Sequence, residues 1–193
     1  MEVGSEESRR VLAADGPLAI RPMRDDASDY ALMSRWLSDD RVLEWVYGRD
    51  QRFSPERAAA KWGPRARGED AVRACIITYE ERGIGYMQYY PIAESPADYG
   101  LDSANGIIGV DMFIGEPDLW DRGLGSGALR TLVAYLYTQV GVQGVVIDPR
   151  LTNARAIRAY EKADFQKVKM LHRHEFHEGA WQDNWLMVHQ REK

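Results

Sequence analysis

Apolar residues recur at helical spacing over residues 29–38 and 124–140, and the longest amphipathic stretch runs from 124 to 140. Together with shorter candidate segments, this pattern predicts helices over residues 29–38, 42–47, 54–62, 124–140 and 153–163. The third helix opens with Ser54-Pro55-Glu56, which supplies an N-cap, a first-turn proline and a first-turn acid. Gly63-Pro64 should end that helix near residue 62.

Other stretches are rich in β-branched and aromatic residues, which is typical of strands. The expected strands cover 18–23, 72–79, 84–92, 107–114, 145–147, 165–175 and 181–189. Turns at 80–83 and 178–179 should make two hairpins, and 93–105 should form a long loop. The order of elements predicts an α/β fold with a mixed, partly antiparallel (α+β) sheet. We expect a single domain over 17–193, preceded by a flexible tail over 1–16.

Composition narrows the class of protein. The 193 residues suit one domain, 45% are apolar, and a formal net charge of −5 argues against nucleic acid as the partner. Cys75 is the one cysteine, so no internal disulfide can form and a reducing compartment is expected. No apolar run reaches the ~20 residues of a membrane span, and the N-terminus lacks the apolar core of a signal peptide. We therefore expect a cytoplasmic monomer or homodimer with no membrane contact.

A glycine-rich segment over residues 121–128 precedes the strongest predicted helix. Glycines let the backbone approach a ligand closely, and the free amides and dipole of a helix start favour phosphate oxygens. Gly123, Gly125 and Ala128 match the spacing of a dinucleotide fingerprint, but eight residues separate them from the preceding strand. Because that fingerprint requires a strand immediately before it, the pyrophosphate of coenzyme A is the better ligand.

The loop resembles the motif of the GNAT acetyltransferase superfamily: Arg or Gln, two residues, Gly, one residue, then Gly or Ala, here residues 122–127. The segment 147–165 resembles the matching coenzyme region, in which an Asn opens a helix and a Tyr follows seven residues later. These are Asn153 and Tyr160. The superfamily usually has Gly where this chain has Asp164. Asp tolerates a left-handed helix end better than most residues, so the fold is not affected.

This resemblance implies the GNAT acyl-CoA N-acyltransferase fold and a set of coenzyme-binding residues. They are Met112, Phe113, Ile114, Arg122, Gly123, Leu124, Gly125, Ser126, Gly127, Ala128, Asn153, Ala156 and Tyr160. The chemistry requires a group that protonates the departing thiolate, and a positioned Tyr hydroxyl can do this. By resemblance that group is Tyr160; a purely structural tyrosine in the core is the alternative.

Four segments, 42–45, 84–90, 108–111 and 147–149, together resemble the aminoglycoside 6′-N-acetyltransferases, and the resemblance extends over about 18–190. It implies direct acetyl transfer from acetyl-CoA to the 6′-amino group of an aminoglycoside in a ternary complex, hence antibiotic resistance. The implied acceptor-binding residues are Trp45, Tyr86, Gln88, Tyr90, Asp98, Asp102, Asp111 and Asp148, with Tyr89 and Tyr99 as further aromatic candidates. Asp111 is assigned to amine binding and base catalysis, with Asp148 as second choice.

Charge gives an independent argument for a cationic acceptor. Seven acidic residues and no Lys or Arg lie between Glu94 and Asp121, which would attract a polycation, although a solvated acidic surface has the same composition. Acylation of another amine, such as a lysine-type siderophore precursor or a polyamine, stays open, as does a non-catalytic acyl-CoA-binding or antibiotic-binding module. His172, His174 and His177 have no fourth ligand at suitable spacing, so no metal is expected.

Overall fold

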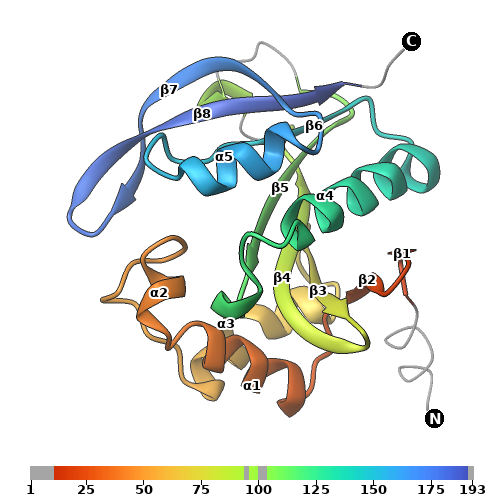
Figure 1. Ribbon diagram of the computed structural model, residues 1–193, viewed down its shortest axis with the longest axis vertical. Coiled ribbons are helices and arrows are strands. Elements are labelled where there is room, and N and C mark those ends of the chain that lie inside the picture. The colour runs from red at the N-terminus through yellow and green to blue at the C-terminus, as the bar shows by residue number, and fades with distance from the viewer. Residues whose placement is uncertain (1–10, 94–95, 100–103, 191–193) are drawn as a thin grey trace.

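The computed structural model describes residues 11–93, 96–99 and 104–190 and is built on one mixed eight-stranded sheet (Figure 1). Its strand order is β1-β2-β3-β4-β5-β6-β8-β7. The strands are β1 (Ala13–Asp15), β2 (Leu18–Pro22), β3 (Arg73–Tyr79), β4 (Arg82–Pro91), β5 (Ile107–Ile114), β6 (Gly144–Ile147), β7 (Gln166–His177) and β8 (Ala180–Gln190). The mixed, partly antiparallel sheet expected from the sequence is confirmed.

Within the described residues, five α-helices cover the two faces of the sheet. They are α1 (Ala27–Trp36), α2 (Asp40–Leu43), α3 (Pro55–Ala66), α4 (Leu124–Tyr135) and α5 (Ala154–Glu161). Along β3, Cys75 and Ile77 pack into the core that includes α4 and α5, while Ala74 and Ile76 pack into the core with α1 to α3. The apolar run of β3 is therefore continuous because both of its faces are buried.

The sheet opens between β5 and β6, the strands that precede α4 and α5 (Figure 1). These two strands run parallel and pair only from Ile107–Gly144 to Gly109–Val146. Beyond these pairs β5 continues to Ile114 beside β4, whereas β6 ends at Ile147. Residues 111 and 148 thus stand on opposite sides of the opening, each two positions beyond the last pair.

Two expected boundaries were wrong. Helix α3 continues through Gly63-Pro64 to Ala66 instead of ending near residue 62. Gly63 is buried, and a Cβ there would lie 3.3 Å from the hydroxyl of Tyr30, so this glycine serves close helix packing rather than helix termination. The expected N-terminal tail also differs, because Ala13–Asp15 forms β1 and pairs with β2 across a turn that contains Gly16. Residues 1–10 lie outside the described residues.

The ends of the other helices follow the local sequence. The predicted helix over 124–140 is continuous, with α4 passing into a π-helical segment, Leu136–Val140, that ends at left-handed Gly141. The short second helix lies slightly earlier than expected, at Asp40–Leu43, because the Asp39 side chain caps it. Asp164 has φ +64°, the left-handed helix end expected for this position. No helix in the described part of the chain is long and apolar enough to span a membrane.

Candidate active site

The first of two adjoining cavities lies at the start of α4. Its floor contains Met112, Phe113 and Ile114 of β5, and its wall contains Gly123 to Ser126. Gly123 precedes the helix in the left-handed region at φ +78°, and no atom lies within 4 Å of the place where its Cβ would be. The glycine therefore allows a sharp entry into the helix and leaves open space above its first turn.

The first turn of α4 limits which backbone amides face the cavity. Gly127 N–H donates to Gly123 O at 2.9 Å, so the helical ladder begins at residue 127. The amides of residues 124–126 precede that bond and lie in the segment that lines the cavity. Gly127 and Ala128 do not line it, because Gly127 packs beside Leu18 and Ala128 is fully buried in the core. Arg122 is exposed and also lies outside the lining.

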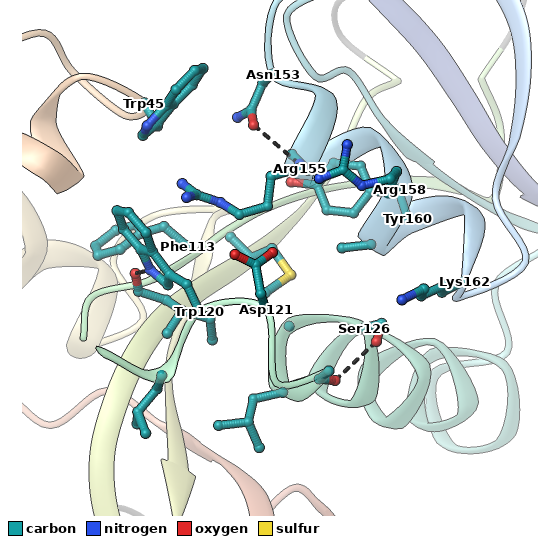
Figure 2. Close-up of a pocket in the computed structure, with 18 of the residues that line it drawn as sticks. Trp45, Phe113, Trp120, Asp121, Ser126, Asn153, Arg155, Arg158, Tyr160 and Lys162 are labelled. Atoms are coloured by element: carbon teal, nitrogen blue, oxygen red, sulfur yellow. Dashed lines mark hydrogen bonds between the residues drawn. The ribbon is translucent and has the colours of Figure 1, made fainter. Parts of the chain in front are cut away.

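Helix α5 forms the facing wall of the first cavity. Asn153 caps this helix, since its Oδ1 accepts from Ala156 N–H at 3.1 Å. Figure 2 shows Arg155 reaching from α5 between Trp45 and Trp120, and its guanidinium carbon lies 3.7 Å from the centre of the Trp120 ring. Arg155, Arg158 and Lys162 line the cavity against one acid, Asp121. The first cavity is thus positively charged at its surface, as a phosphate ligand requires.

The second cavity extends across the opening from Asp111 to Asp148 and contains a carboxylate fixed by cross-strand partners. Gln88 of β4 and Asp111 of β5 are paired in the antiparallel register, which places their side chains on one face. Gln88 Nε2 donates to Asp111 Oδ2 at 2.6 Å, and the Tyr90 hydroxyl donates to Oδ1 at 3.3 Å. A Cβ at Gly109 would lie 2.5 Å from the Tyr90 ring, so glycine here lets that ring lie against β5.

The protein surroundings change the acidity of Asp111. Its side chain retains some solvent contact through the cavity, yet protein atoms displace most of its water. This desolvation, followed by the nearby charge of Asp148, raises the pKa of Asp111 to about 6, while the hydrogen bonds from Gln88 and Tyr90 act in the opposite direction. Asp111 is therefore ionised at neutral pH but holds a proton more readily than an ordinary aspartate.

Asp148 occupies the other side of the opening. His174 Nε2 of β7 lies 2.7 Å from its Oδ2, and Asn184 Nδ2 of β8 donates to its backbone carbonyl at 2.6 Å. The two strands of the β7–β8 hairpin therefore hold Asp148 in position through contacts with its side chain and its backbone carbonyl. Glu175 also lines this cavity, so three acids stand against one arginine, Arg150, and the net charge of the lining is opposite to that of the first cavity.

Tyr160 of α5 lines both cavities. Its side chain is buried, and desolvation, reinforced by the charges of Asp111 and Asp148, raises the pKa of its hydroxyl above the ordinary value. The hydroxyl therefore keeps its proton at neutral pH and can donate it. Trp45, Met112, Phe113 and Asn153 are likewise shared by the two linings.

Most of the acceptor residues predicted from the sequence meet in the second cavity, namely Trp45, Tyr86, Gln88, Tyr90, Asp111 and Asp148. Tyr89 lies elsewhere, beside Tyr135, and Tyr99 lies beside the ring of His174. Asp102 lies outside the described residues, as does the side chain of Asp98. Among the described residues, no group of three His, Cys, Asp or Glu side chains is arranged to hold a metal.

Sequence reasoning missed several residues that line the cavities. Trp120 and Lys162 line the first, and Tyr47, His174, Glu175 and Asn184 line the second. Simple alternation along the hairpin does not predict that His174 and Asn184 share the cavity, because the register between β7 and β8 shifts between Leu171 and Glu175. Tyr47 stood at the end of the helix predicted over 42–47, but α2 ends at Leu43 and Tyr47 lies beyond it.

The comparisons with known proteins agree with this geometry. A family model described as an acetyltransferase (GNAT) domain matches residues 25–173, so this chain belongs to the GNAT acetyltransferase family. It is 29% identical over 140 residues to the aminoglycoside N(6′)-acetyltransferase type 1 of Klebsiella pneumoniae, a match that spans 72% of this chain and 70% of that protein.

Solved structures show the same fold. The crystal structure of aminoglycoside acetyltransferase AAC(6′)-Ib in complex with coenzyme A and kanamycin matches with a TM-score of 0.75 and 25% identity, covering 90% of this chain and 95% of that one. A spermidine N-acetyltransferase from Vibrio cholerae, in complex with coenzyme A and spermine, matches with a TM-score of 0.73, covering 91% of this chain and 96% of that one. At 14% identity the second likeness concerns the fold alone.

Proposed function

We propose that this protein transfers the acetyl group of acetyl-CoA to the 6′-amino group of an aminoglycoside and so confers resistance to that antibiotic. Two cavities of opposite charge meet at Tyr160, and the acidic one contains Asp111, a carboxylate held by two hydrogen-bond donors. This juxtaposition carries the proposal, because a carboxylate that can accept a proton and a hydroxyl that can donate one line the same cavity. The aminoglycoside acetyltransferases among the relatives supply the acceptor class.

The first cavity suits the coenzyme. The amides at the start of α4 and the cations Arg155, Arg158 and Lys162 provide donors and positive charge for phosphate groups. Gly125 leaves the lining free of a side chain beside Met112. When bound there, acetyl-CoA supplies the acetyl group already activated as a thioester.

In the proposed reaction, Asp111 binds the acceptor ammonium and takes a proton from it, because an alkylammonium with a pKa near ~10 is not nucleophilic at neutral pH. The nitrogen forms a bond to the acetyl carbon while the carbon–sulfur bond breaks. Tyr160 donates its proton to the departing thiolate and is reprotonated from solvent. The nitrogen loses two protons in total, of which one equivalent ends on sulfur and one in solution.

The test is thiol release from acetyl-CoA with kanamycin, tobramycin, spermidine and lysine compared side by side. We expect release with the two aminoglycosides and little above background with spermidine or lysine. An aminoglycoside that carries a hydroxyl at the 6′ position is the matched control and should not be acetylated there. Release with spermidine or lysine alone would overturn the antibiotic acceptor and favour a polyamine or amino acid acceptor.

A further inference from the structure

Gln88 connects Asp111 to a side chain that lies outside the acceptor cavity. While its Nε2 donates to Asp111, its Oε1 accepts from Arg65 Nη1 at 2.7 Å and from the Tyr86 hydroxyl at 2.7 Å. Because the guanidinium of Arg65 can only donate, the amide of Gln88 has one orientation, with its oxygen toward Arg65 and its NH₂ group toward Asp111. Arg65 therefore determines that the NH₂ group of Gln88, and not its carbonyl oxygen, faces the carboxylate of Asp111.

Arg65 is itself held in place. It lies in the last turn of α3, and its side chain is only 20% exposed. Its Nε lies 3.4 Å from Asp70 Oδ2, and Asp70 Oδ1 accepts from Val72 N–H at 2.9 Å. Asp70 thus orients one edge of the guanidinium and leaves Nη1 for Gln88. A continuous chain of polar contacts runs from Asp70 through Arg65 and Gln88 to Asp111.

A cation beside a cavity that binds cations needs an explanation. Arg65 does not line the cavity, because Gln88 stands between it and Asp111. Its charge nevertheless acts on the carboxylate: it lowers the pKa of Asp111, whereas Asp148 and desolvation raise it. The other described titratable groups around Asp111 are Tyr47, which follows α2, Tyr90 of β4 and Tyr160 of α5, in addition to Asp148 after β6. Arg150, His174 and Glu175 line the same cavity, and among these described groups Arg65 is the cation whose charge lowers the pKa of Asp111.

We propose that Arg65 is a positioning residue for the transfer reaction: through Gln88 it orients Asp111 and keeps this carboxylate in the charged form that accepts the proton of the amine. The inference rests on the proposed function and specifies how its base is maintained. An arginine placed behind the amide stabilises the carboxylate without meeting the cationic acceptor directly.

The test compares Arg65→Met, Arg65→Lys and Arg65→Gln with the wild type. Without the charge, Asp111 holds its proton to higher pH, so the acid limb of kcat/KM for the aminoglycoside should move upward by about half to one pH unit. The ratio of activity at pH 6 to that at pH 8 should then fall about threefold. Arg65→Gln retains a donor to Gln88 but no charge and should shift the limb like Arg65→Met. Arg65→Lys should stay near the wild-type profile.

Arg67→Met is the matched control, because Arg67 follows the same helix but pairs with Asp25 and Glu69 at the surface. It should leave the profile unchanged. Equal loss of kcat/KM at every pH in both neutral variants would mean that Arg65 only packs α3 against the sheet, and would overturn the inference. If Arg65→Met does not fold, the pH profile of Arg65→Gln tests the inference instead.

A second measurement separates this inference from the proposed function. The titration of Asp111 can be followed by carboxyl-carbon NMR in aspartate-labelled protein, with Asp111→Asn to assign the signal. An upward move of that titration in Arg65→Gln supports the inference even if no aminoglycoside is acetylated. An unchanged titration overturns it even if the acetyl transfer is confirmed.

Discussion

The two cavities that meet at Tyr160 are built in different ways and carry opposite charge. The first is lined by three cations and one acid; its backbone amides come from one loop and the first turn of α4, and its cations come from α5 and the residue after it. The second is lined by three acids and one arginine, and its wall combines β4, β5, the ends of β6 and α2, α5, and the β7–β8 hairpin. A ligand bound by backbone amides needs a local motif, whereas a ligand bound by side chains needs residues that only the fold brings together.

The most severe way to break the comparison is to remove the proposed base, Asp111, from the second cavity. Asp111→Asn should lower kcat/KM for the aminoglycoside by about 100-fold or more, because a positioned base typically contributes that much. The dissociation constant of acetyl-CoA, measured by calorimetry, should change by less than about twofold, since the two ligands use different walls. Asp118→Asn is the control, because its side chain is 94% exposed. Activity close to that of the wild type in Asp111→Asn would mean that another group is the base.

The shared residue Tyr160 should show a split between binding and turnover. Tyr160→Phe removes the proton donor but keeps the ring, so kcat should fall by about 10–100-fold while acetyl-CoA affinity is retained. Stopped-flow turnover and equilibrium binding together measure this split. Tyr135→Phe, in the part of α4 that contacts Tyr89, should change neither quantity. An equal loss of turnover and affinity in Tyr160→Phe would indicate a structural role only.

The first cavity can be narrowed by one methyl group without unfolding the protein. The Cβ of Gly125→Ala would lie 3.6 Å from Met112 and 3.8 Å from Ile114, which are ordinary contacts, but the added methyl projects from the coenzyme wall. We expect the KM for acetyl-CoA to rise about tenfold and the KM for the aminoglycoside to stay nearly constant. Gly144→Ala, whose Cβ would have similar contacts in β6, should alter neither. A rise in both KM values would place Gly125 in the acceptor site as well.

The smallest expected effect concerns stability. The pKa of Asp111 is raised from 3.8 to about 6 in the folded protein, so the folded state binds more protons than the unfolded state between these values. The free energy of unfolding therefore falls as pH rises from about 4 to 6, and this loss of stability persists above pH 6. Compared with the wild type, Asp111→Asn should gain on the order of 1–2 kcal/mol more in free energy of unfolding at pH 7 than at pH 4, as measured by urea unfolding. If the difference in unfolding free energy between Asp111→Asn and the wild type does not change with pH, the raised pKa of Asp111 is contradicted.

The sequence predicts much of the fold and of the coenzyme wall because their signals are local. The strand over 107–114 and the helix from Leu124 coincide with β5 and the start of α4, and the glycine-rich loop lies where its motif places it. Gly63 misled the prediction because a glycine chosen for contact with Tyr30 looks the same in sequence as one that ends a helix. The contribution of Gly127 was also overestimated, since the register of the helical ladder decides which amides are free.

The second cavity was only partly predictable from the sequence. Gln88 and Asp111 were named by resemblance, but their direct contact depends on the register between β4 and β5, which no local pattern fixes. His174 reaches Asp148 through the pairing of a hairpin with the sheet edge beside β6. Arg65 carried no signal in the sequence, because its partner Gln88 lies 23 residues away on another element.

The shared wall between the cavities has a thermodynamic consequence. Because Trp45, Asn153 and Tyr160 line both cavities, any adjustment of these side chains by a ligand in one cavity changes the free energy of binding in the other. Such linkage is reciprocal: the factor by which acetyl-CoA alters the affinity for the antibiotic equals the factor by which the antibiotic alters the affinity for acetyl-CoA. An inhibitor designed for either half of the site is therefore sensitive to the concentration of the ligand that fills the other half.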